Sequence, residues 1–370
     1  MQKLNHKIKV SILGATGMVG QRFILLLSNH PWFKIVDVAA SENSANKSYK
    51  RAVSSKWVMD DPIPNNIKDL KIRSVENFND IPKGVKVVFS AVDLSEKEKT
   101  RKFEFRYAKK GYAVISTSSA NRGRDDVPMI IPEINHDHLD IIKFQQKKHH
   151  LPDSGLVVVK PNCSIQSYVF VLDALKKANY KVDKVQVTTL QALSGAGYQA
   201  LSDTKFKNNV VPFINGEEEK TEIEPAKIFG SIKDNKIINN VNLKISATCT
   251  RVPIVDGHTA VVNISFSNKK PPIEEFKKIL KSYISLPQNL NLPSAPLCPI
   301  HILDEMDRPQ PKLDLNNDKG MALSIGRIQK DVFFDLRFIG LSHNTLRGAA
   351  GGAILNAELL VKKEYISSEN

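Results

Sequence analysis

The stretch "SILGATGMVGQRF", Ser11–Phe23, predicts the fold of the first part of the chain. It joins an apolar strand pattern, Ile8–Leu13, to a helical pattern through Gly14, Gly17 and Gly20. Glycines in this position allow a tight turn and a close approach of the backbone to a ligand. The free N–H groups and the positive dipole end of the helix then suit a pyrophosphate. We therefore expect a dinucleotide site held by Gly14, Thr16, Gly17, Met18 and Val19.

The residues on either side of this motif alternate between apolar runs and helical patterns. Helices are expected at Gln21–Ser28 and Glu96–Lys110, and strands at Phe33–Ala40, Val85–Ala91 and Gly111–Ser116. This alternation is typical of an α/β fold with a doubly wound parallel sheet. We therefore predict a Rossmann-type cofactor domain over residues 1–158.

After this region the strand patterns become longer. The strand in "SGLVVVKPNC" is expected to lead, through a Pro-Asn turn, into a helix that ends at Ala178. Further elements are expected as a covering helix at Ile273–Ile284 and strands at Lys184–Ala192, Leu243–Pro253, Thr259–Phe266 and Val332–Gly340. They predict an α+β catalytic and dimerisation domain with a mixed sheet over residues 159–344. We expect the last helix, within 345–370, to pack back on the first domain through its small residues.

The composition argues against several classes of protein. The three cysteines have no CxxC spacing, so we expect no metal site, no disulfide framework and a reducing, cytoplasmic location. We also expect no signal peptide, and no apolar run reaches the ~18–20 residues of a membrane span. The formal net charge of +14 comes from dispersed lysines, which favours a solvated surface over nucleic-acid binding. Part of it is expected to steer anionic substrates into a cleft.

The end of the second strand bears on which dinucleotide binds. Asp37 lies too far inside the strand to reach the ribose hydroxyls. Ser41, Ser44 and Lys47 follow the strand and suit a 2′-phosphate, although Glu42 opposes such a group electrostatically. We therefore expect NADP(H) as the cofactor.

One cysteine, Cys163 in "KPNCSIQSYVF", follows a Pro-Asn turn where a helical pattern begins. A helix N-terminus stabilises a thiolate, whereas a lone cysteine is more often a small buried hydrophobe, so position alone leaves both interpretations open. We expect Cys249 and Cys298 to be structural. A thiolate beside a nicotinamide site suggests aldehyde or acyl chemistry. In "TRVPIVDGHTAVV", Arg251 would then bind a carboxylate group of the substrate, and His258 would serve as the acid/base.

Six segments occur in order across nearly the whole chain: "GATGMVGQRF", "PNCSIQSYVFVLDAL", "LQALSGAGY", "NGEEEK", "TRVPIVDGHTAVV" and "NTLRGAAGGAILNAELL". Together they closely resemble the aspartate-β-semialdehyde dehydrogenase family, in its archaeal and fungal-like branch. The resemblance implies NADPH-dependent reductive dephosphorylation of L-4-aspartyl phosphate to L-aspartate 4-semialdehyde. This step leads toward lysine, threonine, methionine and isoleucine. It also implies a homodimer or homotetramer.

The resemblance assigns roles to residues of this sequence. The catalytic group comprises the nucleophile Cys163, the acid/base His258, the substrate-orienting Gln191, and Asn162 beside the thioester oxygen. The substrate group comprises Arg251 for the α-carboxylate, Glu217 for the ammonium, and Lys220 and Arg122 for the phosphate. Glu218 and Glu219 stay open as rivals of Glu217. Further cofactor contacts are expected from Ser90, Ser194, Gly195 and, at the nicotinamide carboxamide, Asn344.

Two positions depart from the family pattern, and other functions stay open. Asn43 stands where an arginine is usual, and Arg124 stands where an acidic residue is common. A malonyl-CoA reductase or an N-acetylglutamyl-phosphate reductase would share the architecture, but their substrates lack the ammonium that Glu217 would bind. A non-catalytic NADP(H) sensor is an alternative of another class, and it would not need the thiol, imidazole, glutamate and arginines together.

Overall fold

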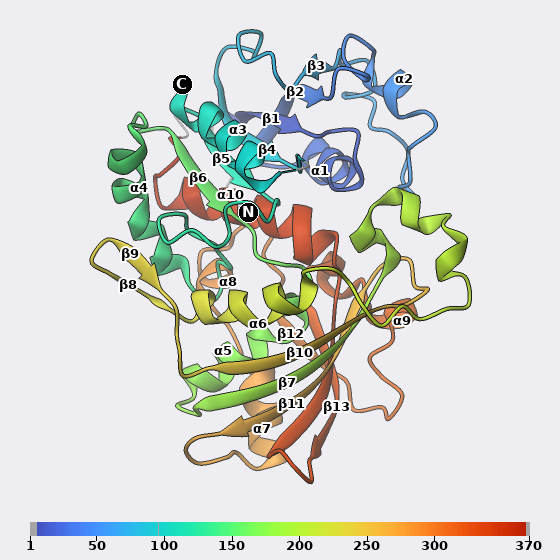
Figure 1. Ribbon diagram of the computed structural model, residues 1–370, viewed down its shortest axis with the longest axis vertical. Helices are drawn as coiled ribbons and strands as arrows, with labels where there is room; N and C mark the ends of the chain where they lie inside the picture. The colour runs from blue at the N-terminus through green and yellow to red at the C-terminus, as the bar shows by residue number, and fades with distance from the viewer. Residues whose placement is uncertain (1–5, 95, 368–370) are drawn as a thin grey trace.

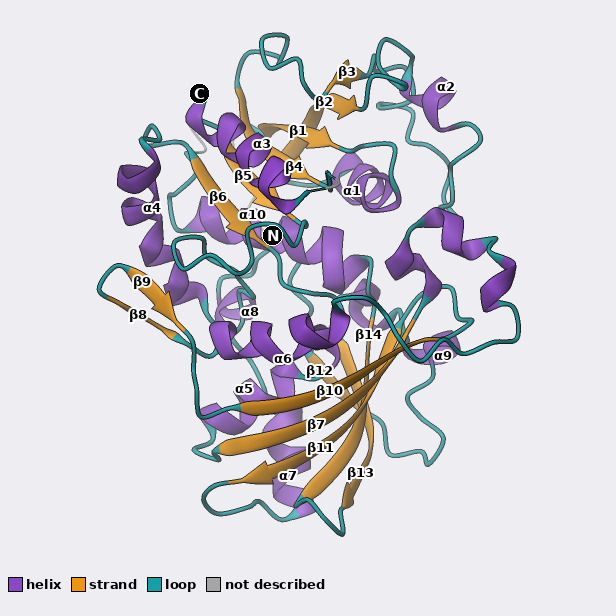
Figure 2. Ribbon diagram, viewed as in Figure 1, coloured by secondary structure: helices purple, strands orange, loops and turns teal. Residues whose placement is uncertain are grey.

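Two six-stranded sheets, one in each half of the chain, organise the molecule (Figure 1). The computed structural model describes residues 6–94 and 96–367. Residues 1–5 and 95 of the predicted segment 1–158, and residues 368–370 of the predicted segment 345–370, lie outside the described residues. In the view of Figure 2 the helices α6 (Glu217–Ile228) and α10 (Gly351–Lys362) lie between the two sheets.

The first sheet has the order β3-β2-β1-β4-β5-β6, and every pair in it is parallel. Its strands are β1 (Ile8–Leu13), β2 (Phe33–Ala40), β3 (Arg73–Ser74), β4 (Val85–Ser90), β5 (Ala113–Ser116) and β6 (Leu156–Val159). The helices α1 (Met18–Ser28) and α10 form one hydrophobic core cluster with residues of this sheet. The helix α3 (Lys97–Lys109) belongs to a second cluster, which contains other residues of the same strands. The predicted doubly wound sheet is therefore confirmed, and its strands read as apolar runs because both faces are covered.

The second sheet is mixed, as predicted, and has the order β10-β7-β11-β14-β13-β12. Its strands are β7 (Val182–Gln191), β10 (Lys244–Arg251), β11 (His258–Phe266), β12 (Ile300–Ile302), β13 (Leu323–Lys330) and β14 (Leu336–Ser342). The outer pairs β10–β7 and β12–β13 are parallel, and the inner pairs are antiparallel. The helices α5 (Val169–Lys177) and α7 (Ile273–Lys281) pack on this sheet through Phe170 and Phe276.

Shorter elements connect these layers. The remaining α-helices are α2 (Tyr49–Val53), α4 (Ile142–His149), α8 (Leu286–Asn289) and α9 (Pro311–Asp314), and a hairpin is formed by β8 (Ser231–Lys233) and β9 (Lys236–Ile238). Short 3₁₀ turns occupy His136–Ile141, Ser164–Ser167, Leu193–Ala196, Tyr198–Leu201, Thr204–Phe206 and Asn317–Gly320, and Leu346–Ala350 is a π-helical turn that continues into α10. Across the described residues, no helix is long and apolar enough to cross a membrane.

The predicted continuous helix from the Pro-Asn turn to Ala178 is wrong. A 3₁₀ turn, Ser164–Ser167, comes first, and the chain then breaks at Tyr168, whose φ is −149°, before α5 begins. The Tyr168 side chain is fully buried and its hydroxyl donates to the backbone oxygen of Thr221 at 3.1 Å. This tertiary contact favours the break over the helical pattern. Cys163 is therefore the first residue of a tight turn.

The strand predicted to begin at Val332 begins only at Leu336. The backbone N–H groups of Phe333 and Phe334 both donate to the Asp331 carboxylate, which closes a turn before the strand. Val332 and Phe333 are about nine-tenths exposed at this turn, so their apolar character does not indicate a buried strand.

Candidate active site

The glycine turn between β1 and α1 is shaped to receive a ligand with its backbone. Gly14 has a φ of +73°, and a Cβ there would lie 2.6 Å from the backbone oxygen of Ala91. A Cβ at Gly20 would overlap the Gly14 carbonyl. Helix α1 begins at Met18 after Gly17, which has no side chain to cap the helix. The N–H groups at this helix start are therefore available to an anion, and the donor set fits a dinucleotide pyrophosphate.

The segment after β2 carries the three residues predicted to bind a 2′-phosphate. Ser41 is exposed and Ser44 is buried, and the Ser44 N–H donates to the Ser41 carbonyl at 2.9 Å. Lys47 is exposed, and its Nζ donates to the backbone oxygen of Asn43 at 2.7 Å. The structure thus brings one cation and one accessible hydroxyl to this turn.

Two acidic side chains near this turn are engaged by other residues. Asp37 is buried inside β2, where it accepts from Arg73 at 2.7 Å and from Ser11 at 2.6 Å. Glu42 accepts a hydrogen bond from the Ser74 hydroxyl. Asp37 is therefore paired with Arg73 inside the fold, while Glu42 lies exposed at the edge of the turn.

The sulfur of Cys163 lies 3.3 Å from Nε2 of His258, although the two residues are far apart in the sequence. The His258 Nδ1 atom accepts a hydrogen bond from the backbone N–H of Ala192 at 3.0 Å. Because a backbone N–H can only donate, the neutral imidazole carries its proton on Nε2, facing the sulfur. His258 is thus oriented as a donor toward Cys163.

Burial keeps both members of this pair neutral at rest. It raises the pKa of the Cys163 thiol to about 11, and the Glu217 carboxylate acts in the same direction, against Arg122, Arg251 and Lys160. Burial, followed by the Arg251 charge, lowers the pKa of His258 to about 3. The resting pair is therefore a thiol and a neutral imidazole, and the thiol requires a bound substrate or another group to become a strong nucleophile.

The ends of β7 and β10 bring Gln191 and Arg251 beside this pair. The buried Arg251 guanidinium donates to the Ala192 carbonyl at 2.7 Å. Gln191 Nε2 lies 3.4 Å from the Glu217 carboxylate, and Asn162 Nδ2 donates to the same oxygen at 3.0 Å. Because β7 and β10 are parallel, their C-terminal residues meet at one edge of the sheet.

The three adjacent glutamates at the start of α6 have different surroundings. Glu217 faces the cysteine side and forms an ion pair with Lys220 at 2.7 Å. Burial alone would raise the pKa of Glu217, but the Lys220 ammonium and the amides of neighbouring residues lower it below its ordinary value. Glu218 instead accepts from the Cys249 N–H at 3.0 Å, and Glu219 is exposed. Of the three, Glu217 alone is placed among the other predicted substrate ligands.

Arg122 reaches this region from the loop after β5. Its guanidinium pairs with Glu224 at 3.0 Å and donates to the Thr117 carbonyl at 2.9 Å. Arg124 points elsewhere, since it forms a two-point pair with Asp126 at 2.9 Å. The unusual Arg124 therefore has its own partner and does not compete with Arg122.

The remaining predicted cofactor residues fall into two groups. Asn344 donates to the Ser194 hydroxyl at 2.7 Å and accepts from the Gly257 N–H at 2.8 Å, so three loops are joined there. A Cβ at Gly195 would lie 3.0 Å from Arg251 and 3.1 Å from the His258 ring, which places this glycine beside the Cys163–His258 pair. Ser90 is fully buried, and its hydroxyl donates to the Glu104 carboxylate of α3.

Comparison with known proteins decides the family. The model for the semialdehyde dehydrogenase NAD binding domain matches residues 9–142, and that for the semialdehyde dehydrogenase dimerisation domain matches 172–347. An aspartate-semialdehyde dehydrogenase of Schizosaccharomyces pombe is 42% identical over 96% of this chain and 98% of its own length. That of Archaeoglobus fulgidus is 41% identical over 97% of this chain and 100% of its own.

The chain belongs to the aspartate-semialdehyde dehydrogenase family. The crystal structure of the Candida albicans aspartate-semialdehyde dehydrogenase with NADP superposes with a TM-score of 0.87 and 36% identity, and covers 98% of this chain and 100% of that one. The family relationship suggested by the sequence motifs is thus confirmed, and the similar proteins include fungal and archaeal ones.

Glu224, which was not predicted from the sequence, links two predicted site residues of this dehydrogenase. One oxygen of Glu224 holds Arg122, and the other accepts from the backbone N–H of Asn162 at 2.5 Å. A signal was present, because Glu217 and Glu224 are seven residues apart and therefore share one face of α6. Lys160 was also missed: it is 1% exposed and its Nζ has no hydrogen-bond partner among the described residues.

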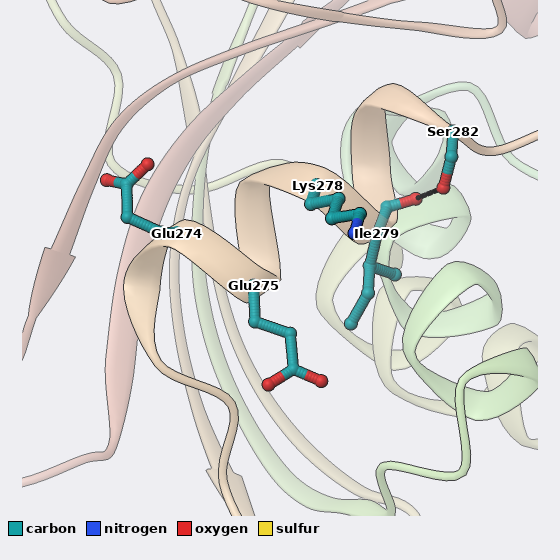
Figure 3. A pocket seen from close by; sticks show the side chains of 5 residues that line it. All are labelled: Glu274, Glu275, Lys278, Ile279 and Ser282. Atoms are coloured by element: carbon teal, nitrogen blue, oxygen red, sulfur yellow. Dashed lines mark hydrogen bonds between the residues drawn. The ribbon is translucent and has the colours of Figure 1, made fainter.

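A pocket elsewhere on the described surface has a different character. Figure 3 shows a shallow pocket along α7, lined by Glu274, Glu275, Lys278, Ile279 and Ser282. Its lining is the solvated face of a single helix. Within residues 6–94 and 96–367, no three His, Cys, Asp or Glu side chains are grouped to hold a metal ion.

Proposed function

We propose that this chain reduces L-4-aspartyl phosphate with NADPH to L-aspartate 4-semialdehyde, releasing phosphate, through a thioester on Cys163. The observation that carries the proposal is the 3.3 Å contact between Cys163 and His258, surrounded by one group of opposite charge for each charge of that substrate. Membership of the aspartate-semialdehyde dehydrogenase family supports the same reaction.

The substrate would be held by charge complementarity. Arg251 suits the α-carboxylate because a guanidinium binds a carboxylate through two parallel hydrogen bonds. Glu217 suits the ammonium, and Lys220 and Arg122 suit the phosphate. In the described structure each of these ions except Arg251 has an internal ion-pair partner. Substrate binding would exchange these internal pairs for pairs with the ligand.

The chemistry would begin when the Cys163 sulfur attacks the acyl carbon and the carbon–oxygen bond to phosphate breaks. The thiol proton balances the charge on the departing phosphate. When bound, NADPH supplies the hydride that reduces the acyl group. The Nε2–H of His258 would hydrogen-bond the acyl oxygen. The thiolate released with the aldehyde would then take up one proton from solvent through His258, so that one proton is consumed for each hydride transferred.

The cofactor would bind along the carboxyl edge of the first sheet. Gly14, Thr16, Gly17, Met18 and Val19 would hold the pyrophosphate, and Ser41, Ser44 and Lys47 the 2′-phosphate. Ser194, Gly195 and Asn344 would contact the nicotinamide end. The Candida albicans relative was solved with NADP, which supports this choice of cofactor.

The matched dimerisation domain supports a homo-oligomer. We propose a homodimer or homotetramer, which light scattering coupled to size-exclusion chromatography would distinguish. The cytoplasmic location stays a prediction.

The experiment is phosphate-dependent reduction of NADP by aspartate semialdehyde, compared between the wild type and Cys163→Ala. Cys298→Ala is the matched control, because Cys298 is exposed and remote in sequence from every predicted site residue. We expect Cys163→Ala to lose at least about a thousandfold in kcat and Cys298→Ala to match the wild type. Equal activity in the wild type and Cys163→Ala would refute the mechanism.

Two parallel assays separate the alternatives. Consumption of malonyl-CoA with NADPH, without activity on aspartate semialdehyde, would transfer the assignment to a malonyl-CoA reductase. Binding of NADPH without turnover of either substrate would favour the non-catalytic sensor.

A further inference from the structure

A carboxyl group without a cationic partner is buried at the carboxyl edge of the first sheet. Glu104 of α3 is fully buried and forms no ion pair within the described part of the chain. Its Oε1 accepts from Ser90 Oγ at 2.9 Å and from Ser116 Oγ at 2.5 Å, and these serines are the last residues of β4 and β5. Its Oε2 accepts from Asn121 Nδ2 at 2.8 Å. A buried carboxyl with three donors and no counter-ion is costly and calls for a functional explanation.

Glu104 fixes the base of the loop that carries Arg122. Asn121 precedes Arg122 directly, and Arg101, also on α3, donates to the Ala120 carbonyl at 2.6 Å. Within the loop, Arg122 donates back to the Thr117 carbonyl at 2.9 Å. The orientation of Arg122 therefore depends on how the loop is attached to α3.

From Arg122 a continuous set of contacts reaches the nucleophile. Arg122 pairs with one oxygen of Glu224, and the other oxygen accepts from the backbone N–H of Asn162 at 2.5 Å. Asn162 precedes Cys163. Packed and hydrogen-bonded groups thus connect Glu104 without a break to the predicted phosphate site and to the cysteine turn.

The two protonation states of Glu104 require different hydrogen bonds. Burial raises the pKa of Glu104 to about 7, although the bonds from Ser116, Asn121 and Ser90 lower it, and Asp93, from the loop after β4, raises it further. The carboxylate accepts from all three donors. The protonated acid must itself donate, and since Asn121 Nδ2 cannot accept, a serine hydroxyl or the loop has to rearrange.

We propose that Glu104 is a positioning residue for Arg122, and that its ionised form holds the 116–124 loop in the geometry that binds the substrate phosphate. This inference rests on the proposed function, because it assumes that Arg122 binds that phosphate. Its consequence is that anion affinity at Arg122 falls as the pH drops through neutrality.

Binding of inorganic sulfate to the full-length protein tests this without catalysis. Sulfate keeps a constant charge over the pH range used, unlike phosphate, and Arg122→Ala reports binding elsewhere on the basic surface. We expect the Arg122-dependent sulfate affinity of the wild type to fall roughly tenfold from about pH 8 to about pH 6. Glu104→Gln, which cannot ionise, should show no such change.

Ser90→Ala separates a positioning role from a merely structural one, and it also serves if Glu104→Gln fails to fold. Losing one donor to the carboxylate should move the midpoint of the sulfate profile to higher pH by about one unit. An unchanged midpoint in Ser90→Ala, a wild-type profile in Glu104→Gln, or Arg122-independent sulfate binding would each overturn the proposal. If the wild type had no activity on aspartate semialdehyde but showed these sulfate profiles, only the proposed reaction would be refuted.

Discussion

At the scale of single residues, the three adjacent glutamates of α6 offer a matched comparison. Glu217→Gln removes the partner of Lys220 and the predicted ammonium ligand, so kcat/KM should fall by roughly a hundredfold or more. Glu218→Gln weakens the bond to the Cys249 N–H and should cost on the order of 1 kcal/mol of unfolding free energy, with activity retained. The exposed Glu219→Gln should be silent in both.

Steady-state kinetics and urea unfolding of the three variants check this ordering. Glu219→Gln is the internal control, because it makes the same chemical change one residue away. The assignment of the ammonium ligand is wrong if the loss of kcat/KM appears in Glu218→Gln and not in Glu217→Gln.

The raised pKa of Cys163 predicts the pH dependence of its reactivity. The thiolate is a small fraction at neutral pH when the pKa is about 11, and this fraction grows tenfold for each pH unit below that value. Alkylation of the ligand-free enzyme by iodoacetamide should therefore accelerate roughly a hundredfold between about pH 7 and about pH 9.

Mass spectrometry of the Cys163 peptide, in a Cys298→Ser background, follows this reaction without interference from the exposed thiol. A rate that is already constant below about pH 8 would mean a stabilised thiolate at rest. It would contradict a neutral Cys163–His258 pair.

At the scale of elements, the π-helical turn before α10 must approach the cysteine turn closely. A Cβ at Gly348 would lie 2.6 Å from Cys163 Cβ and 3.0 Å from its Cα. Gly348→Ala should therefore displace the nucleophile, cost roughly 1–3 kcal/mol of stability, and lower kcat far more than NADP affinity. Calorimetry, kinetics and cofactor titration measure these quantities. Gly123→Ala is the control for stability alone, since a Cβ there meets nothing within 4 Å but Gly123 adjoins Arg122. Unchanged kcat in Gly348→Ala would argue against this close packing.

Elements with a regular pattern were predictable from the sequence, and elements shaped by distant contacts were not. The strands of the first sheet read as apolar runs because both of their faces are buried. Strand β13 was missed because Gly326 and the positive-φ Arg327 interrupt its pattern at a register shift. Strand β12 was missed because it has only three residues. The break at Tyr168 depends on a contact with Thr221, which no local pattern encodes.

The candidate site shows the same division. Residue types and family motifs pointed to Cys163, His258 and Arg251, and the structure brings these side chains together. Glu224 and Glu104 went unnoticed because their roles come from partners in other elements. The burial and the hydrogen-bond partners of these carboxylates are set by the tertiary fold, so a local sequence pattern does not indicate them.

At the scale of the whole molecule, the two halves of the chain are joined by partly and fully buried polar contacts. Arg22 of α1 binds Asp256 of the second half at 3.0 Å, and Arg347 pairs with Glu133 at 2.6 Å with almost no exposure. We propose the boundaries 1–158, 159–344 and 345–370, in which the last segment returns to the first domain. Because Arg347 lies in the C-terminal segment and Glu133 in the first domain, this segment helps to hold the two halves in position.

Deleting residues 345–370 should therefore unfold the cofactor domain, although that domain precedes the cut by nearly two hundred residues in the sequence. Residues of α10, among them Ile354, Leu355 and Leu359, are fully or almost fully buried in the core cluster that includes β1 and α1. Their loss would expose that core and also remove Arg347 from Glu133. A chain ending at Ser367 is the matched control, because it keeps the whole helix. Far-UV circular dichroism, thermal unfolding and NADP binding would compare the two chains. The 1–344 chain should be insoluble or should lack both a cooperative transition and NADP affinity. If it bound NADP like the longer chain, the first domain would be complete without α10, and its boundary would have to be drawn without the returning helix.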